Sequence, residues 1–447
     1  MNDAAYRGFP RVCDVSGHKG RAGRAAALAL IAVVTAWAAW PGLRTAAPAG
    51  FVAPQPFAAA ASAGVQATPR LVSAIVNEAE PPRVHAASIA ALPDGRLFAT
   101  WFGGEREGGT EVKIYGAFRA PGAVAWETQQ VIASPEQTSA DVGRLVRKMG
   151  NPLAFVTPAG ELWVVYVSVT MGGWATSHLN LLRSPDLGRS WLPAQRLVAS
   201  PFLNLSTLVK GYPVSFDNGD IGLPVYHEMA GKFAELLVLS AGGEVRRKQR
   251  IDHGRRSLQP VVLVQDAQRA VALMRYGGEQ APFRAWRSET ADGGRSWSAV
   301  EATDLANPNS ALAALRLEDG RLLAVANDTD DERLRLSLLV SADEGRHWRV
   351  IHRFEDKQAL AGKELDEPVF RALLEQDVDA LGAAPAREVI VRNTERNLCR
   401  GNGPCGWQYD YPYLVRAADG DFHLVYTWNR SFVRHLQFNR AWLEGKL

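Results

Sequence analysis

One short motif recurs three times in this 447-residue chain and constrains its fold more than any other feature. It reads Ser/Thr-x-Asp-x-Gly-x-x-Trp and occurs at residues 184–191, 290–297 and 341–348. The Ser or Thr and the Asp can accept hydrogen bonds from the turn's own backbone, Gly permits the bend, and Trp can pack between neighbouring units. The three Asp are 106 and 51 residues apart. This spacing predicts one structural unit per roughly 50 to 60 residues.

A second pattern, in which two short apolar runs flank a turn, lies between these motifs. Six copies begin at Leu92, Thr157, Phe216, Val264, Leu317 and Ala417. Gly at the turn supplies the positive φ that tight hairpins need, and the fourth copy has Ala267 instead. Runs of Val, Leu and Ala are typical of strands that are buried on both faces.

Four-stranded units that repeat in this way form a ring. We therefore predict an all-β fold, a six-bladed β-propeller over residues 70–447, although length alone would suggest about three domains. The segment at Leu71, LVSAIVN, is expected to complete the last sheet and close the ring. The largest interruption lies between Trp348 and Tyr411, where the apolar spacing predicts a helix over residues 366–382.

The N-terminal residues differ in composition from the repeats. Residues 1–24 form a basic leader, residues 25–43 are uncharged and long enough to span a bilayer, and residues 44–69 form an Ala- and Pro-rich linker. We expect a transmembrane anchor with the propeller in the periplasm or extracellular space. A cleaved signal peptide and secretion are the alternative. Cys399 and Cys405 would then lie in an oxidising compartment, where a disulfide is expected.

Charge and motifs exclude several classes of function. The net charge is +3, which is too balanced for a protein whose affinity comes from neutralising phosphates, so we expect no nucleic-acid partner. Phosphate-binding loops, HExxH and GxSxG segments and clustered Cys and His ligands are missing from the sequence. No metal and no cofactor are therefore predicted, and the oligomeric state is open.

The repeated motifs resemble the Asp-box, or BNR, repeats of the sialidase superfamily, and the hairpins resemble its inner strands. In that family a Tyr nucleophile is assisted by a Glu, an Asp is the acid/base, and three Arg bind the substrate carboxylate. By resemblance, Tyr411 in YPYL is the nucleophile and Arg275 in LMRYGG is one carboxylate-binding Arg. Gln259 stands where the assisting Glu would be. Because Gln cannot take a proton, Tyr411 cannot be activated in the family's usual way.

The other family positions match less well. His85 aligns with the first-blade Arg, Arg83 lies two residues earlier, and Asn309 opens the fifth blade where a third Arg is expected. We expect these side chains to line the axial cleft as substrate-binding residues, together with Tyr226 and His227 at the end of a blade-three strand.

For the acid/base, the loop GGEREGGTE offers Glu105, Glu107 and Glu111 but no Asp. Glu107 is favoured because it lies in the middle of the loop, although spacing cannot separate the three. The resemblance predicts an exo-acting glycoside hydrolase that cleaves a terminal, acidic sugar from glycans. Two alternatives remain open: a polysaccharide lyase in which His85 or Tyr411 abstracts a proton beside a uronate carboxylate, and a non-catalytic glycan-binding propeller.

Overall fold

The structure, a computed structural model, describes residues 25–33, 49–53, 68–200, 204–251, 256–382, 386–399 and 405–447. The chain divides into two units, Met1–Pro48 and Ala49–Leu447. In the first unit residues 25–33 are helical. Among the described residues, none of the helices has the length and apolar character needed to cross a membrane. The basic leader 1–24, residues 34–43 of the proposed anchor and most of the linker 44–69 lie outside the described residues, so the anchor stays a prediction.

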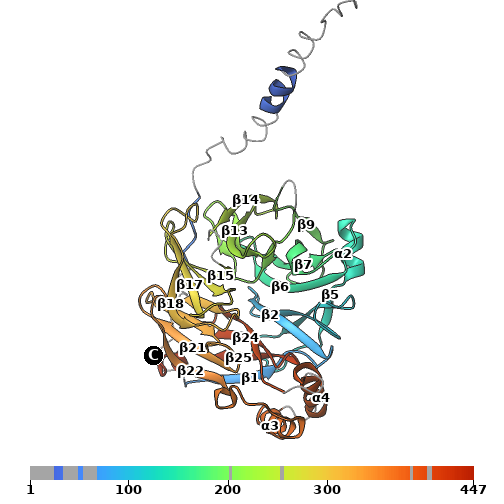
Figure 1. Cartoon of the computed structure of the whole chain (residues 1–447), viewed down its shortest axis with the longest axis vertical. Coiled ribbons are helices and arrows are strands. Elements are labelled where there is room, and N and C mark those ends of the chain that lie inside the picture. Colours follow the sequence, from blue (N-terminus) through green and yellow to red (C-terminus); the bar gives the residue numbers. More distant parts are fainter. Residues whose placement is uncertain are drawn as a thin grey trace, which may run out of the picture. The chain divides into compact units, whose positions relative to one another are not determined.

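The second unit is a six-bladed β-propeller, as predicted (Figure 1). In the described part of the chain the strands form six antiparallel sheets, and the first strands of neighbouring sheets pack against one another. Blade one contains β2 (Arg83–Ala91), β3 (Leu97–Gly104), β4 (Lys113–Arg119) and β5 (Gln130–Ala133). Blade two contains β6 (Lys148–Val156), β7 (Leu162–Val169), β8 (His178–Ser184) and β9 (Gln195–Leu197). Blade three contains β10 (Leu208–Val209), β11 (Val214–Ser215), β12 (Ile221–His227), β13 (Phe233–Leu239) and β14 (Val245–Arg250).

The last blade closes the ring with a strand from the beginning of the propeller. β1 (Leu71–Ile75) pairs antiparallel with β25, with Leu71 opposite Phe438, which confirms the predicted closure. Blade four contains β15 (Ser257–Val264), β16 (Ala270–Tyr276), β17 (Arg284–Thr290) and β18 (Glu301–Ala306). Blade five contains β19 (Ala313–Arg316), β20 (Leu322–Ala326), β21 (Arg335–Ser341) and β22 (Arg349–Asp356). Blade six contains β23 (Tyr409–Arg416), β24 (Phe422–Trp428) and β25 (Phe432–Phe438), with β1 as its outer strand.

Inner strands are apolar on both faces because each blade lies between two others. Every residue of β7, LWVVYVSV, is buried. Fully burying a Val or Leu side chain contributes about 1.5–3 kcal/mol, so such strands supply much of the stability of the ring. Five of the predicted hairpin turns end in a Gly with φ between 83° and 91°, as in Gly95 and Gly420, a region that disfavours other residues.

Five blades have a residue with φ near +50° at or just before the first strand. These residues are Ala86 (50°), Asn151 (45°), Gln259 (50°), Asn309 (52°) and Tyr411 (55°). In four blades this residue lies where the pairing register shifts, in β2, β6, β15 and β23. Left-handed backbone costs a non-glycine residue about 1–2 kcal/mol. Strain of this kind gathers at functional sites, so these positions identify the end of the propeller where a site is expected.

The Ser/Thr-x-Asp-x-Gly-x-x-Trp motifs follow the third strand of their blades. In the second copy, Asp292 accepts hydrogen bonds from the backbone N–H groups of Arg295 and Ser296, each 2.9 Å long, and from the Thr290 hydroxyl. Burial opposes ionisation of Asp292, but these hydrogen bonds lower its pKa to about 2. The first strand of each blade runs from the bulge to the hairpin turn, and the third strand runs in the same direction because both are antiparallel to the second. The hairpin turns and the motifs that follow the third strands therefore lie on one face of the propeller, the turn face, and the bulges lie on the other.

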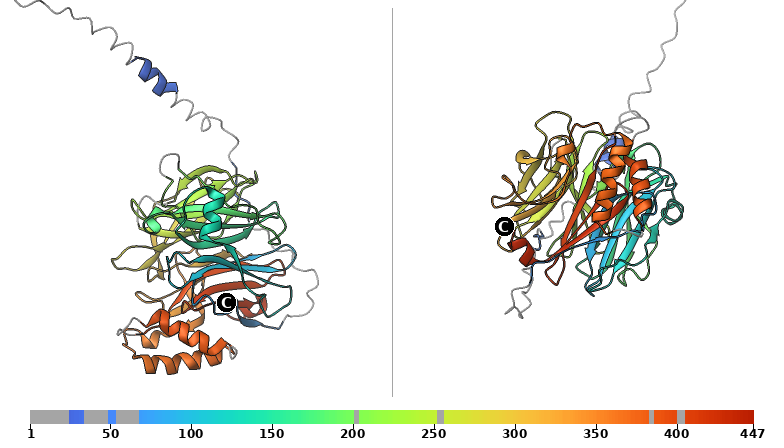
Figure 2. Two further views of the ribbon diagram at one scale, coloured as in Figure 1. Left: turned by 90° about the vertical axis from the view of Figure 1, so that its right-hand side faces the viewer. Right: turned by 90° about the horizontal axis from the view of Figure 1, so that it is seen from below.

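The predicted helix is confirmed as α3 (Glu367–Ala380), which is capped by Asp366 and buries Phe370, Leu374 and Val378. α4 (Arg387–Leu398), not predicted, lies beside α3 (Figures 1 and 2) and is linked to it by an Arg371–Glu395 ion pair of 2.7 Å. The expected disulfide joins Cys399 and Cys405. The remaining helical segments are α2 (Pro135–Val142), α5 (Arg440–Glu444) and the short η1 (Trp174–Thr176) and η2 (Gln358–Leu360).

Residues 49–53, which belong to the predicted linker, pack against blades three and four. Phe51 is 2% exposed, and its ring stacks on Phe216 at 5.0 Å. Its N–H donates to the carbonyl of Ala267 at 2.8 Å, and the N–H of Asp217 donates to the carbonyl of Gly50 at 2.9 Å. Asp217 and Ala267 belong to hairpin turns, so this segment is bound on the turn face.

Candidate active site

A hydrogen-bonded cluster forms where the bulges of different blades meet. Arg275, near the end of β16, donates through Nε to Asn309 Oδ1 at 2.7 Å. Its Nη1 donates to Gln259 Oε1 at 3.0 Å and to the Tyr411 hydroxyl at 3.3 Å. The structure therefore brings together four residues that were identified from the sequence in three different blades.

Arg275 fixes the orientation of the Gln259 amide. Because Arg275 occupies Oε1, Nε2 faces two tyrosines and donates to the hydroxyls of Tyr411 at 3.1 Å and Tyr226 at 3.4 Å. Asn151 Nδ2 donates to the same Tyr226 hydroxyl at 3.1 Å. The oxygen of Tyr411 is thus surrounded by donors, and Gln259 is one of them.

An ion pair between Asp410 and Arg333 lies next to this cluster. Asp410, which precedes Tyr411, is fully buried and accepts a 2.6 Å hydrogen bond from Arg333. Arg333 also donates to the carbonyl of Asn309 at 2.7 Å. The Asp410 charge, opposed by desolvation, raises the pKa of Arg333. Arg333 thus links the carboxylate of Asp410, at the bulge of β23, to the backbone of Asn309, just before β19.

His85 lies beside Tyr411 and not at the bulge of its own strand. The two ring centroids are 4.4 Å apart, and His85 is 4% exposed. The residue with positive φ at the bulge of β2 is Ala86, so His85 lies one residue before the position that Gln259 and Tyr411 occupy in their strands. Burial lowers the pKa of His85, and Asp410 Oδ2 lies 4.0 Å from its Nδ1. His85 is therefore a buried neighbour of Tyr411.

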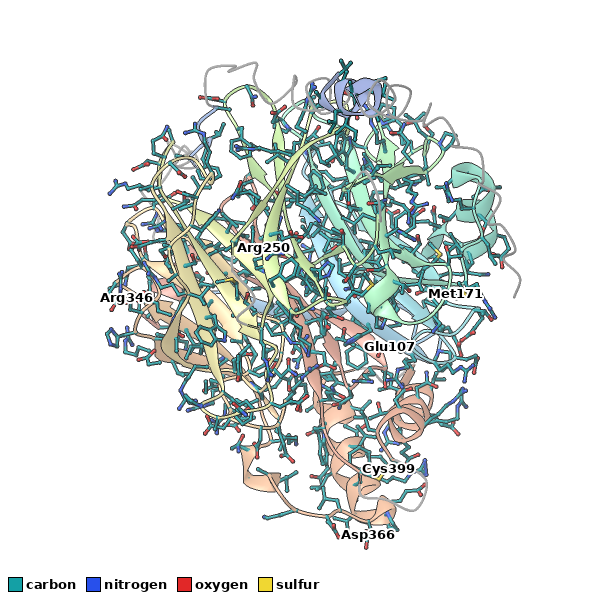
Figure 3. All side chains as sticks on the ribbon, turned by 45° about the horizontal axis from the view of Figure 1, so that its top comes forward. Glu107, Met171, Arg250, Arg346, Asp366 and Cys399 are labelled. Atoms are coloured by element: carbon teal, nitrogen blue, oxygen red, sulfur yellow. A yellow bond between two sulfur atoms is a disulfide. The ribbon has the colours of Figure 1, made fainter. Side chains whose placement is uncertain are left out.

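The structure separates the three glutamates of the loop after β3. Glu111 accepts hydrogen bonds from the N–H groups of Glu105 and Arg106, so it holds the loop together. Glu105 forms an ion pair with Arg396 of α4. Glu107 lies 3.8 Å from Arg83, and Figure 3 shows it toward the middle of the propeller, away from the peripheral Arg346. Of these three carboxylates, Glu107 is the one directed to the cluster side.

Tyr226 and His227 have different environments. Tyr226 is buried and belongs to the cluster. His227 stacks on Phe233 at 4.6 Å and accepts the N–H of Ala230 at 3.0 Å, so it stabilises its own turn. The next residue, Glu228, is half-buried, and burial raises its pKa while the charge of Arg275 opposes the increase. A carboxyl group with a raised pKa near an arginine is a candidate acid.

Lys210, in the gap between β10 and β11, lies beneath the cluster. Its ammonium is buried, donates to the carbonyls of Ala87 at 3.4 Å and Pro412 at 3.3 Å, and lies 4.8 Å above the Tyr413 ring. Burial lowers the pKa of Lys210 to about 7. A buried amine with a lowered pKa therefore lies close to the cluster, with its nitrogen 5.6 Å from the centre of the Tyr411 ring.

Sequence reasoning missed four residues that build the site: Asn151, Lys210, Arg333 and Asp410. Asn151 and Lys210 do carry a signal, because each lies nine residues before a turn glycine, Gly160 and Gly219, as Tyr411 lies before Gly420. Arg333 lies in a loop with no repeated spacing, so the sequence carried no signal for it.

No metal centre was found in the part of the chain that the structure describes, since no three His, Cys, Asp or Glu side chains lie together there. The cluster instead presents a phenol, a planar guanidinium and amide groups. Such groups can bind an oxygen-rich, anionic ligand and provide a nucleophile.

Comparison with known proteins gives a family and a fold. A family model described as BNR repeat-like domain matches residues 95–424. No curated protein matches the chain.

Solved structures match over most of the chain. A Hadza microbial sialidase is 15% identical with a TM-score of 0.58, and the match covers 82% of this chain and 66% of the sialidase. A protein of unknown function from Dyadobacter fermentans is 13% identical with a TM-score of 0.58, over 83% and 97%. A Penicillium chrysogenum α-L-arabinanase, complexed with arabinobiose, is 13% identical with a TM-score of 0.54, over 85% and 100%. At these identities the likeness establishes the fold.

Proposed function

The chain belongs to the BNR repeat-like domain family, and on that premise we propose that it is a glycoside hydrolase that removes an acidic sugar from the end of a glycan. The observation that carries the proposal is the convergence of Gln259 and Arg275 on the hydroxyl of Tyr411. Two structures of similar fold are named a sialidase and an arabinanase, both enzymes of glycans.

Tyr411 is the proposed nucleophile. Its oxygen attacks the anomeric carbon while the glycosidic bond breaks, and the phenol proton leaves to water. A tyrosine is a better choice than a carboxylate beside an anionic sugar, because its phenol is neutral until it attacks and so does not repel the substrate. Gln259 and Arg275 stabilise the phenolate by donating to it, which takes the place of deprotonation by a Glu.

Glu107 is the proposed acid/base. It protonates the leaving oxygen in the first step and accepts a proton from the attacking water in the second, when the bond to Tyr411 breaks. Two arginines lie near its carboxylate, Arg83 at 3.8 Å and Arg430 at 3.7 Å. Glu228 is the second candidate, since its raised pKa favours proton donation.

The substrate is proposed to be an acidic sugar, but not strictly a sialic acid. Arg275 is the proposed carboxylate binder, and its guanidinium faces the cluster from β16. The other two family arginines are replaced by the β2 segment with His85 and by Asn309, which supply less positive charge. Because His85 is buried, it is a poor choice for the base of a lyase.

The test replaces Tyr411 by Phe and measures turnover of a panel of uronate and sialate glycosides. Turnover is expected to fall by at least about 10³-fold, with unchanged Tm, because Phe has no nucleophilic oxygen. Tyr115→Phe on β4 is the matched control and should retain activity, since Tyr115 lies outside the cluster. Unsaturated products absorbing in the ultraviolet would instead identify a lyase. Oligosaccharide binding without any product would identify a binder.

Membrane attachment remains a proposal as well. The disulfide between Cys399 and Cys405 favours a propeller outside the cytoplasm, where such bonds persist. Fractionation of cells that express the full chain tests it: an anchored propeller is found with membranes, whereas a propeller released by cleavage after the apolar segment 25–43 is found in the soluble fraction or the medium.

A further inference from the structure

A cavity lies beside the cluster, between the propeller and the segment that carries α3 and α4. Its volume is about 490 Å³, within the range of ligand pockets, about 300–1,000 Å³. The propeller wall includes Arg83 from β2, Glu332 before β21 and Arg430 from the turn between β24 and β25. The opposite wall includes Lys363 and residues 405–408, which the disulfide at Cys405 ties to α4.

Two guanidinium groups of this cavity have unused donors. Within the described residues, neither Arg83 nor Arg430 donates a hydrogen bond through its side chain, and the Nε atoms of both are buried. Their nearest carboxylate oxygens belong to Glu107, at 3.8 and 3.7 Å, and to Asp410, 3.6 Å from Arg430. These distances are too long for hydrogen bonds. Leaving buried donors unsatisfied is costly, so the pair is suited to a ligand that supplies acceptors.

Arg275 differs in this respect. Its Nε and Nη1 donors are already used by Asn309, Gln259 and Tyr411. The arginines with most donors available to a ligand are therefore those of the cavity and not the one in the cluster. Lys363, exposed on the outer wall, adds a third positive charge, while Glu332 adds one negative charge.

We propose that this cavity is a second subsite, which takes the anionic group, a carboxylate or a sulfate, of a sugar unit next to the one held at Tyr411. The inference rests on the proposed function and narrows its substrate class to glycans with acidic groups on adjacent units. Arg83 and Arg430 bind the anion through paired N–H donors, the geometry that suits both groups. The cavity adjoins the cluster because Asp410, which Arg430 approaches, precedes Tyr411.

The experiment measures binding to the full chain by calorimetry with three probes: a short oligogalacturonate, a sulfated oligosaccharide without uronate, and a neutral oligosaccharide of equal length. At least one acidic probe is expected to bind about tenfold more tightly than the neutral one. The acidic probe that binds more tightly shows whether the subsite takes a carboxylate or a sulfate. Arg83→Gln and Arg430→Gln are each expected to weaken that probe about tenfold, whereas Arg430→Lys retains part of the affinity. Lys363→Gln should weaken binding by about two- to threefold and reduce its salt dependence.

Arg147→Gln is the matched control. Arg147 lies in another cavity near Glu107, so its loss removes the same charge without touching the proposed subsite. If Arg147→Gln weakens binding as much as Arg83→Gln, the effect is general attraction and the proposal is wrong. Equal affinity of the wild type and both cavity arginine variants would also overturn it. If Arg430→Gln fails to fold because Asp410 loses a neighbouring charge, the affinities of Arg83→Gln and Lys363→Gln for the acidic probe test the proposal.

The two proposals can fail separately. If Tyr411→Phe retains full turnover while Arg83→Gln still weakens the acidic probe, the hydrolase mechanism is wrong and the subsite stands. If Tyr411→Phe abolishes turnover while Arg83→Gln and Arg430→Gln bind normally, the mechanism stands and the subsite is wrong.

Discussion

Gln259 illustrates how one side chain changes the chemistry that a shared fold can carry out. Its oxygen accepts from Arg275 and its nitrogen donates to Tyr411, so it cannot act as a base in this arrangement. A phenol surrounded by donors must lose its proton to water. In the proposed mechanism the activation of Tyr411 is therefore electrostatic, and the next question is which carboxyl group is the acid.

Two carboxyl groups can be compared directly as that acid. On an alkyl glycoside, whose leaving oxygen needs a proton, Glu107→Gln is expected to lower kcat by about 10²-fold or more, and Glu228→Gln by less than about tenfold. On a nitrophenyl glycoside, which leaves without help, the loss in Glu107→Gln should be much smaller.

The opposite ranking would assign the acid to Glu228. In that case activity would persist on the basic side to a pH above the usual carboxyl range, because burial raises the pKa of Glu228. Such a basic limb in the pH profile of wild-type kcat would support Glu228 without mutation.

Tyr411, Gln259, Arg275 and Asn309 were found from the sequence because each lies at a fixed place relative to a repeated turn or strand. Arg333 and Arg430 could not be found, since loops between strands have no period. In β2 the residue nine positions before the turn glycine Gly95 is Ala86, and His85 lies one residue earlier.

At the scale of elements, the Ser/Thr-x-Asp-x-Gly-x-x-Trp turns stabilise blades without taking part in the site. Asp292→Ala removes the acceptor for two backbone N–H groups and two hydroxyls. The expected cost is about 1–3 kcal/mol, seen as a Tm lower by a few degrees, with kcat unchanged because the turn lies on the face opposite the cluster.

Glu279→Ala, an exposed change on a loop, is the control for that measurement and should leave Tm unaltered. A fall in kcat without a fall in Tm for Asp292→Ala would contradict a purely structural role.

Blades could be predicted because their turns recur, whereas α2 and α4 occur once and have no repeated signal.

At the scale of the whole molecule, the ring depends on the contact between its first and last blades. β1 pairs with β25, where His435 lies 3.1 Å from His423 and 3.2 Å from Arg119 of blade one. Burial lowers the pKa of His423 to about 4 and that of His435 well below its usual value, with Arg119 acting in the same direction. Both rings are therefore neutral in the folded protein.

Acid should loosen this closure. Between the usual histidine pKa of about 6.5 and about 4, the unfolded chain binds protons that the folded chain cannot, so stability falls as pH decreases. The slope is up to about 1.4 kcal/mol per pH unit for each histidine. Tm measured from pH about 7.5 to about 4.5 should be level above the usual pKa and then decline, with faster hydrogen exchange in β1.

His423→Gln is expected to make that decline shallower. His347→Gln is the control, because His347 is exposed beside Asp343, which raises its pKa, and its loss should leave the decline intact. An unchanged slope in His423→Gln would show that other groups cause the acid sensitivity.

The docking of Phe51 on the turn face has a practical consequence. The chain enters the propeller at Ala49, on the side opposite the bulges that carry Gln259 and Tyr411. A tag, bead or sensor surface joined directly before Ala49 would therefore be attached to the turn face, on the side opposite Gln259 and Tyr411. The C-terminus lies on the same face, because β25 is the third strand of its blade and Arg349, next to the third motif, donates to the carbonyl of Leu447 at 2.8 Å.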